Sequence, residues 1–341
     1  MKQLLKFTLN LLLISAFFLL ATACTENESI VDPTGTSDIE QLQKLIDNDD
    51  IIQSFEPNYN EEEAMDLLFP GLAKAIFPVR VGQKMKLIDR NETFDIQNDT
   101  AYGEVIRTYE GTLKIAASYE EFAPGDSNVV DTLIEKNFIT TITRSIVFVK
   151  ATNNIIPERE WRIYKMSLPN GGTDTENIKI IKLTIILPDG NEIIVDNPNE
   201  YYLTREPGLR DQLPIISRGE NVTIRVEIKS AYEEDDFVTL THGGRRDDRH
   251  GGRRDDGHDD PRDDEHGDLR DDRNHRSKRK FELISSELDG SYYKKVYENV
   301  WEANRFPGAK HAIINAMPKQ VVFDDETEVE TNGWGIPYIV K

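Results

Sequence analysis

Much of the chain after residue 100 alternates between apolar and polar positions with a period of two, which is typical of strands with one buried face. Residues 101–115 and 138–150 carry this pattern, and residues 160–168 add a third strand. In the second half, further strands are predicted at residues 178–187, 193–195, 222–229, 237–241, 280–285, 293–303 and 309–316. The dipeptides Asp189-Gly190 and Asp289-Gly290 mark turns between neighbouring strands of this set.

Two helices are predicted before the first strand. Ser37-Asp-Ile-Glu40 is a capping box ahead of periodic apolar residues, and it predicts a helix over residues 38–48. A second helix is expected to begin near Asn60, where three glutamates suit the positive end of the helix dipole. Pro70-Gly71 should kink it before it ends at about Ile76.

Residues 37–170 therefore contain two helices, long antiparallel strands and a closing Trp161-Arg-Ile-Tyr-Lys-Met166 strand. This order resembles the nuclear-transport-factor-2-like cone, a curved sheet wrapped on a helix. The mouth of that cone often holds a small ligand or an active site, so the resemblance implies Arg144 and Tyr109 as ligand-binding candidates. The residues themselves favour another interpretation, in which Arg144 is a paired surface arginine and Tyr109 a core aromatic.

Residues 175–341 contain several short strands at the spacing of a two-sheet sandwich, and the pattern resembles immunoglobulin-like modules of bacterial surface proteins. The tail Asn332-Gly-Trp-Gly-Ile-Pro-Tyr338 is predicted to be a packed closing segment, with an aromatic sugar platform as the alternative. The expected fold class is thus α+β and then all-β: N-terminal helices on a curved antiparallel sheet, followed by a β-sandwich with a long disordered loop.

That loop is an eight-residue repeat between residues 243 and 279. Gly243-Gly-Arg-Arg-Asp-Asp-Arg-His250 is followed by one close copy and by two looser ones. Because Leu269 is almost the only apolar residue in the repeat, burial cannot offset the entropy of ordering it, and we expect a disordered loop that joins two strands. Of the six histidines in the chain, five follow the repeat: His242, His250, His258, His266 and His275.

Three roles for the repeat stay open. Neutral imidazoles with nearby carboxylates suit Zn²⁺, Ni²⁺ or Cu²⁺, and two or three of these histidines could surround one ion. The Asp-Asp pairs could instead hold Ca²⁺, although the repeat lacks the apolar positions of calcium-binding β-rolls. The third role is a hydrated linker without a site. Composition favours it, since 12 acidic residues and nine arginines nearly balance between Gly243 and Arg276.

The N-terminus has the pattern of an export signal. Lys2 and Lys6 precede an apolar run over residues 11–20, and small residues follow, so residues 1–23 are predicted to be a signal peptide. The run has about half of the roughly 20 apolar residues that a membrane-spanning helix needs. Export is therefore expected without a transmembrane helix.

The sequence Leu20-Ala-Thr-Ala-Cys24 resembles the lipobox of bacterial lipoproteins. The resemblance implies that Cys24 carries the lipid, begins the mature chain and attaches it to a membrane. The alternative is an ordinary signal peptide that leaves a free Cys24. Residues 24–36 are expected to form a flexible tether. Thr25 after Cys24, in place of Asp, resembles the signal for sorting to the outer membrane.

The net charge and the single cysteine argue against several classes of function. The formal net charge is −21, or −23 without Lys2 and Lys6, which argues against binding nucleic acid. With Cys24 as the only cysteine, the mature fold has no disulfide and no cysteine metal site. Since no catalytic motif is present, we expect a non-enzymatic binding or scaffolding module of the cell envelope, with an envelope protein or a glycan as partner. Small-molecule binding or catalysis in the cone is the alternative.

Overall fold

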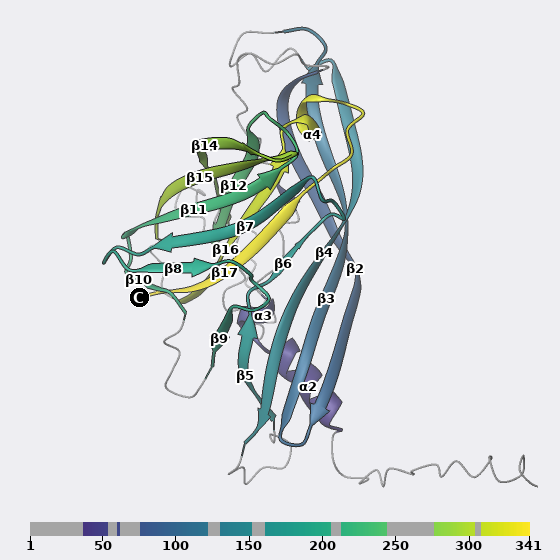
Figure 1. The fold of residues 1–341 in the computed structure, drawn as a ribbon. Helices are drawn as coiled ribbons and strands as arrows, with labels where there is room; N and C mark the ends of the chain where they lie inside the picture. The colour runs from purple at the N-terminus through teal and green to yellow at the C-terminus, as the bar shows by residue number, and fades with distance from the viewer. Residues whose placement is uncertain are drawn as a thin grey trace, which may run out of the picture. The chain divides into compact units, whose positions relative to one another are not determined.

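The computed structural model describes residues 37–53, 60–61, 76–121, 130–151, 161–205, 213–243, 276–303 and 308–341. Within these ranges the protein is mostly β-structure, with a large curled sheet and a second, smaller sheet (Figure 1). Residues Asp38–Lys341 form one compact unit.

The large sheet has twelve strands among the described residues, and its pairs are antiparallel apart from β10 with β17. Its main path is β1-β2-β3-β4-β6-β17-β16-β12-β13; β5 pairs with β4 and β9, and β10 with β17. The strands are β1 (Asn60–Glu61), β2 (Phe77–Gln97), β3 (Thr100–Ser118), β4 (Thr132–Lys150), β5 (Trp161–Ser167), β6 (Asn170–Gly172), β9 (Tyr202–Thr204), β10 (Ile215–Ile216), β12 (Asp236–Gly243), β13 (Arg276–Lys280), β16 (Gly308–Pro318) and β17 (Asn332–Val340).

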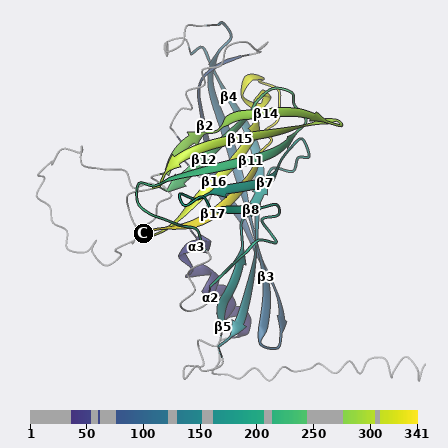
Figure 2. The ribbon, with the colours of Figure 1, turned by 60° about the vertical axis from the view of Figure 1, so that its left-hand side comes forward.

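The small sheet has five strands in the described part of the chain, in the order β14-β15-β11-β7-β8 (Figure 2). They are β7 (Ile178–Ile186), β8 (Glu192–Val195), β11 (Asn221–Ser230), β14 (Glu282–Asp289) and β15 (Tyr292–Glu302). One hydrophobic cluster unites buried residues of both sheets, among them Val226 of β11 and Ile314 of β16. Burial of apolar area between the sheets is therefore a main source of stability.

The period-two pattern locates β3 and the part of β4 after residue 137, whereas β2 was not expected. β2 pairs with β3 along nearly its whole length, but the register shifts between Leu87 and Asp89. Such a bulge turns the following side chains to the opposite face, which breaks the alternation of apolar and polar residues. The strand therefore has no single period in the sequence.

The capping box lies at the start of α2 (Asp38–Asp47), and α3 (Asp50–Gln53) follows. Leu42 and Ile46 of α2 are buried in the same hydrophobic cluster as Val105 of β3. The helix expected from Asn60 to Ile76 is wrong at its start, because Asn60 and Glu61 pair with the edge of β2 as β1. Residues 62–75 lie outside the described residues. None of the described helices has the length and hydrophobicity to span a membrane.

The short strand β6 joins the two halves of the large sheet. One edge of Asn170–Gly172 pairs with β4, and the other edge pairs with β17, the last strand of the chain. The first predicted domain ends at residue 170 and the second begins at residue 175, so these residues lie at the predicted boundary. Instead, they lie in the middle of a continuous sheet, so the two predicted domains share one set of backbone hydrogen bonds.

The repeat leaves the large sheet between two neighbouring strands. Gly243 at the end of β12 is the register partner of Arg276 at the start of β13. Residues 243 and 276–279 were assigned to the disordered loop, but the structure places them in this antiparallel pair. Residues 244–275 lie outside the described residues. The pairing closes the chain on both sides of the repeat, as a hairpin does.

The backbones around Gly171 leave no room for a side chain. A Cβ atom added there would lie 2.1 Å from Thr141 O and 2.7 Å from Ile142 Cα, and backbone atoms in a paired strand cannot move away. We expect Gly171→Ala to lower the free energy of unfolding by about 3 kcal/mol or more, measured by urea denaturation. Gly333→Ala is the matched control, since Gly333 faces Gly171 on β17 but its nearest added contact is 3.3 Å. Equal losses for both variants would contradict this account of β6.

Candidate functional site

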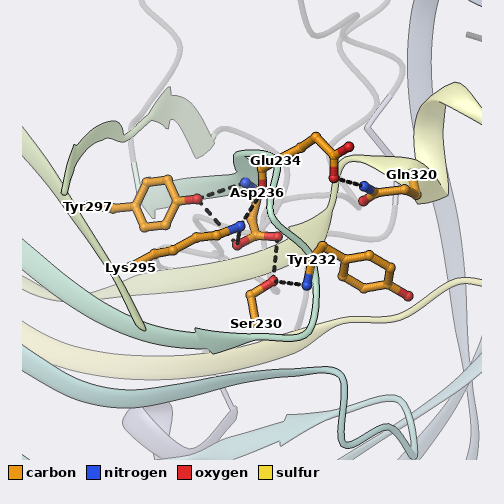
Figure 3. Close-up of polar contacts among 7 residues, drawn as sticks. All are labelled: Ser230, Tyr232, Glu234, Asp236, Lys295, Tyr297 and Gln320. Atoms are coloured by element: carbon orange, nitrogen blue, oxygen red, sulfur yellow. Dashed lines mark hydrogen bonds and ion pairs between the residues drawn. The ribbon is translucent and has the colours of Figure 1, made fainter. Parts of the chain in front are cut away.

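A lysine and an aspartate are fully buried where the small sheet meets the start of β12 (Figure 3). Lys295 lies on β15, and Asp236 is the first residue of β12. Both side chains are 0% exposed, and Lys295 Nζ lies 3.0 Å from Asp236 Oδ2. Because an isolated charge is expensive to bury, two ionisable groups at this depth must compensate each other.

Two hydroxyl groups complete the surroundings of the carboxylate. Tyr297, at the next inward-facing position of β15, accepts a hydrogen bond from Asp236 N at 2.7 Å, and its hydroxyl lies 3.3 Å from Asp236 Oδ2. Ser230, the last residue of β11, donates to Asp236 Oδ1 at 3.1 Å. Both carboxylate oxygens are therefore hydrogen-bonded inside the protein.

The turn between β11 and β12, residues 231–235, is tied to the same cluster. Lys295 Nζ donates to the backbone oxygen of Glu234. The Glu234 carboxylate accepts a 2.5 Å hydrogen bond from Gln320, the first residue of α4 (Gln320–Phe323). The Tyr232 hydroxyl donates to Glu330 at 2.9 Å. The turn is thereby connected to both sheets and to the segment that follows α4.

Burial dominates the electrostatics of this cluster. It raises the pKa of Asp236, and the nearby Lys295 ammonium opposes that rise without cancelling it. Burial and the Asp236 carboxylate together raise the pKa of Tyr297, so its hydroxyl keeps its proton. Because the folded pKa of Asp236 exceeds the unfolded one, its contribution to stability is complete at low pH. That contribution is lost as the pH rises through the folded value.

The cluster brings together an amine, a carboxyl group and a phenol, which are groups used in catalysis elsewhere. Here Lys295 and Asp236 have no exposed surface, so a dissolved substrate cannot touch them in this conformation. Their contacts join β11, β12 and β15 to one another. The arrangement thus supports the connection between the two sheets.

A second buried lysine holds the segment after α4. Lys136 of β4 donates to three backbone carbonyl oxygens: those of Val321 at 2.9 Å, Thr327 at 2.7 Å, and Asp324. Burial lowers the pKa of Lys136, and Asp324 and Asp325 oppose this change. An ammonium group thus lies against the carbonyl oxygens of this acidic turn and holds the turn to β4.

The structure buries both residues that the cone resemblance singled out. Arg144 is 4% exposed, so it is not a surface arginine, and its Nη1 donates to Ile51 O of α3 at 3.3 Å. Burial first, and then the charge of Arg107, lowers the pKa of Arg144 to about 9. Tyr109 is 0% exposed in a hydrophobic cluster with Leu113 of β3, so it is a core aromatic whose hydroxyl does not reach the rim at which it was expected. Tyr109 thus packs among apolar side chains, whereas Arg144 donates to the backbone of α3.

Most of the other predicted sites lie outside the described residues, namely Cys24, His250, His258, His266 and His275. His242 lies on β12 opposite Ser277 of β13. The described part of the chain holds no group of three or more His, Cys, Asp or Glu residues that could bind a metal ion. The histidine repeat thus remains a prediction from the sequence.

The buried cluster was not predicted from the sequence, although the position of Lys295 in its strand is a signal of burial. Lys295 lies between Tyr293 and Tyr297 on the face of β15 that also carries Trp301, and a lysine in an apolar row of this kind indicates a buried partner. Asp236 gives no such signal, because it ends a run of acidic residues that is typical of an exposed turn.

Comparison with known proteins adds no relative to this description. No protein-family model matches the chain, and no curated protein matches it.

Lys295→Met tests whether the fold depends on the buried pair. The variant leaves Asp236 buried without its cation, and we expect the free energy of unfolding to fall by about 3–5 kcal/mol in urea denaturation. Lys294→Met is the matched control on the same strand, because Lys294 is 48% exposed and bonds to Glu227 at the surface. Its loss should be much smaller, because solvent screens an exposed ion pair. A loss as small for Lys295→Met would show that the pair does not support the fold.

Proposed function

We propose that this protein is a lipid-anchored bacterial lipoprotein that acts as a non-enzymatic binding or scaffolding module of the cell envelope. The sequence Leu20-Ala-Thr-Ala-Cys24 carries the proposal, because small residues before a lone cysteine at the end of a short apolar run are typical of a lipidation site. The lipid on Cys24 attaches the protein to the membrane, and Thr25 favours the outer membrane.

The acidic chain and its polar tether support the same proposal. Residues 25–36, which contain Pro33 and Gly35 but few apolar side chains, separate Cys24 from α2. A mature charge of −23 disfavours contact with nucleic acid and with anionic headgroups, so attachment relies on the lipid. The β-structure then presents its surface to an envelope protein or a glycan.

For the finer architecture, we propose that the small sheet and β12, β16 and β17 form an immunoglobulin-like sandwich. We further propose that β2, β3 and β4 form the wall of a cone like that of nuclear-transport-factor-2-like proteins. The hydrophobic cluster shared by the two sheets supports the sandwich. The packing of Leu42 in α2 with Val105 in β3 supports the cone.

The chemistry of the described residues favours binding or scaffolding over catalysis. Asp236 and Lys295 lie away from solvent and bond to each other, and the Lys136 ammonium is occupied by backbone carbonyl oxygens. Groups held this way stabilise a fold but cannot turn over a substrate. The alternative, a ligand or a reaction in the cone, depends on Arg144 and Tyr109, and both are buried.

Cys24→Ala tests the anchor. We expect wild-type protein from a bacterial host to fractionate with membranes and to incorporate labelled palmitate, and Cys24→Ala to lose both properties. Thr22→Ser is the matched control, since a small residue remains at that position and lipidation should continue. Thr25→Asp should move the lipidated protein from the outer to the inner membrane. An unacylated N-terminus in the wild-type protein, found by mass analysis, would refute the proposal.

A second candidate function is transition-metal capture by the repeat, with Zn²⁺, Ni²⁺ or Cu²⁺ as the ion. The eight-residue spacing of His242, His250, His258 and His266 favours it, and the copies that end at His250, His258 and His266 each carry an Asp-Asp pair. Gly243 and Arg276, at the two ends of the repeat, are register partners. The repeat can therefore be replaced by a short turn between β12 and β13.

The pairing of Gly243 with Arg276 also defines the ends of a deletion that removes the repeat. Replacing residues 244–275 with Asn-Gly should leave the fold intact, because this dipeptide suits a tight hairpin between β12 and β13. Titration with Zn²⁺ or Ni²⁺ in a calorimeter should then show binding to the wild-type protein and none to the deletion variant. A full-length control with every repeat histidine changed to Asn should also lose binding. Equal binding by all three proteins would exclude the repeat as the metal site.

A further inference from the structure

The buried cluster has a composition and geometry that suit a covalent bond between side chains. We propose that Lys295 and Asp236 condense to an intramolecular amide, an isopeptide bond between Nζ of the lysine and Cγ of the aspartate. The amine nitrogen lies 3.0 Å from the carboxyl oxygen Oδ2. Both side chains are 0% exposed, so water does not compete for either group.

The condensation balances without any further reactant. One proton first passes from the Lys295 ammonium to the Asp236 carboxylate, which gives a neutral amine and a carboxylic acid. The nitrogen lone pair attacks Cγ, and a C–N bond forms. The C–O bond to Oδ2 then breaks, and Oδ2 leaves as water with a second proton from the nitrogen. One amide and one water molecule result, with no change of oxidation state.

Burial favours the first of these steps. Taking the carboxylate out of water raises the pKa of Asp236, which makes the protonated acid more accessible at neutral pH. A neutral amine beside a neutral acid also avoids two buried charges. The buried carboxyl group therefore reaches its protonated, reactive form more readily than an exposed one does.

Two hydroxyl groups touch the atoms that react. Ser230 Oγ lies 3.1 Å from Oδ1, the oxygen on which negative charge develops during the attack. The Tyr297 hydroxyl lies 3.3 Å from Oδ2, the oxygen that leaves, and its hydrogen bond to Oδ2 orients that oxygen and stabilises it as the C–O bond breaks. Glu234 O accepts a hydrogen bond from Lys295 Nζ and holds the nitrogen at the carboxyl group.

The position of the bond gives it a mechanical consequence. Asp236 begins β12 in the large sheet, and Lys295 lies on β15 in the small sheet, so the bond would join the two sheets covalently. It would also close a ring over residues 236–295, which includes the whole repeat. A crosslink around a long segment restricts the unfolded chain, as a disulfide does. The mature chain has no cysteine pair to serve that purpose.

Peptide mass spectrometry of the full-length protein tests the proposal. After denaturation and digestion with a protease that cleaves at lysine, we expect a branched peptide that joins the segments around Asp236 and Lys295. Its mass should be one water molecule below the sum of the two segments, and cleavage after Lys295 should be blocked. Recovery of both segments only as separate, unmodified peptides would overturn the proposal and leave an ion pair.

Variants assign the roles within the bond. Lys295→Arg keeps a cation but should abolish the branched peptide, whereas Lys294→Arg should retain it. A branched peptide at Asp236 in Lys295→Arg would refute the assignment of the amine. Tyr297→Phe should lower the bonded fraction in newly synthesised protein several-fold, and Tyr293→Phe, on the same face of β15, should leave it unchanged. An unchanged fraction in Tyr297→Phe would refute its part in the reaction.

Discussion

The architecture depends on how closely three backbones approach at β6. Gly171 pairs with Ile142 of β4 on one side and with Gly333 of β17 on the other, and it has room for no side chain. Segments far apart in the sequence thereby share one set of hydrogen bonds, and β17 cannot pair with β6 until the whole segment between them has been synthesised. Pairings this distant in sequence are slow to form, because loop closure must precede them.

Polar joints add specificity to this backbone connection. The Asn332 side chain donates to Gly171 O at 3.1 Å and accepts from Ile180 N at 2.9 Å, so one residue of β17 touches both sheets. Lys295 and Asp236 form a second joint between the sheets, in which every polar atom has a defined partner. Apolar packing tolerates small slips, whereas buried polar groups lose their hydrogen bonds when strands move by a fraction of a residue.

The strands were largely predictable from the sequence, but their pairing was not. Period-two patterns locate β3, β4, β11 and β15, because one face of each is buried. Asn170-Gly-Gly172 has the composition of a linker, and only the backbones on either side make it a central strand. The bulge after Leu87 hides β2 in the same way. At the candidate site neither residue of the pair was predicted: the aromatic neighbours of Lys295 on its strand face are a signal of burial, whereas its partner Asp236 could be found only in three dimensions.

The place of the repeat explains how the fold tolerates it. β12 and β13 pair from Thr239 with Lys280 to Gly243 with Arg276, so the chain leaves and rejoins the sheet at adjacent points. Lengthening a segment between two fixed ends costs little, since loop-closure entropy grows only with the logarithm of its length. The length and composition of the repeat can therefore change without disturbing the pairing of β12 with β13. β13 also ends the described path of its sheet with Arg279 and Lys280, and charges on such an edge oppose pairing with further strands.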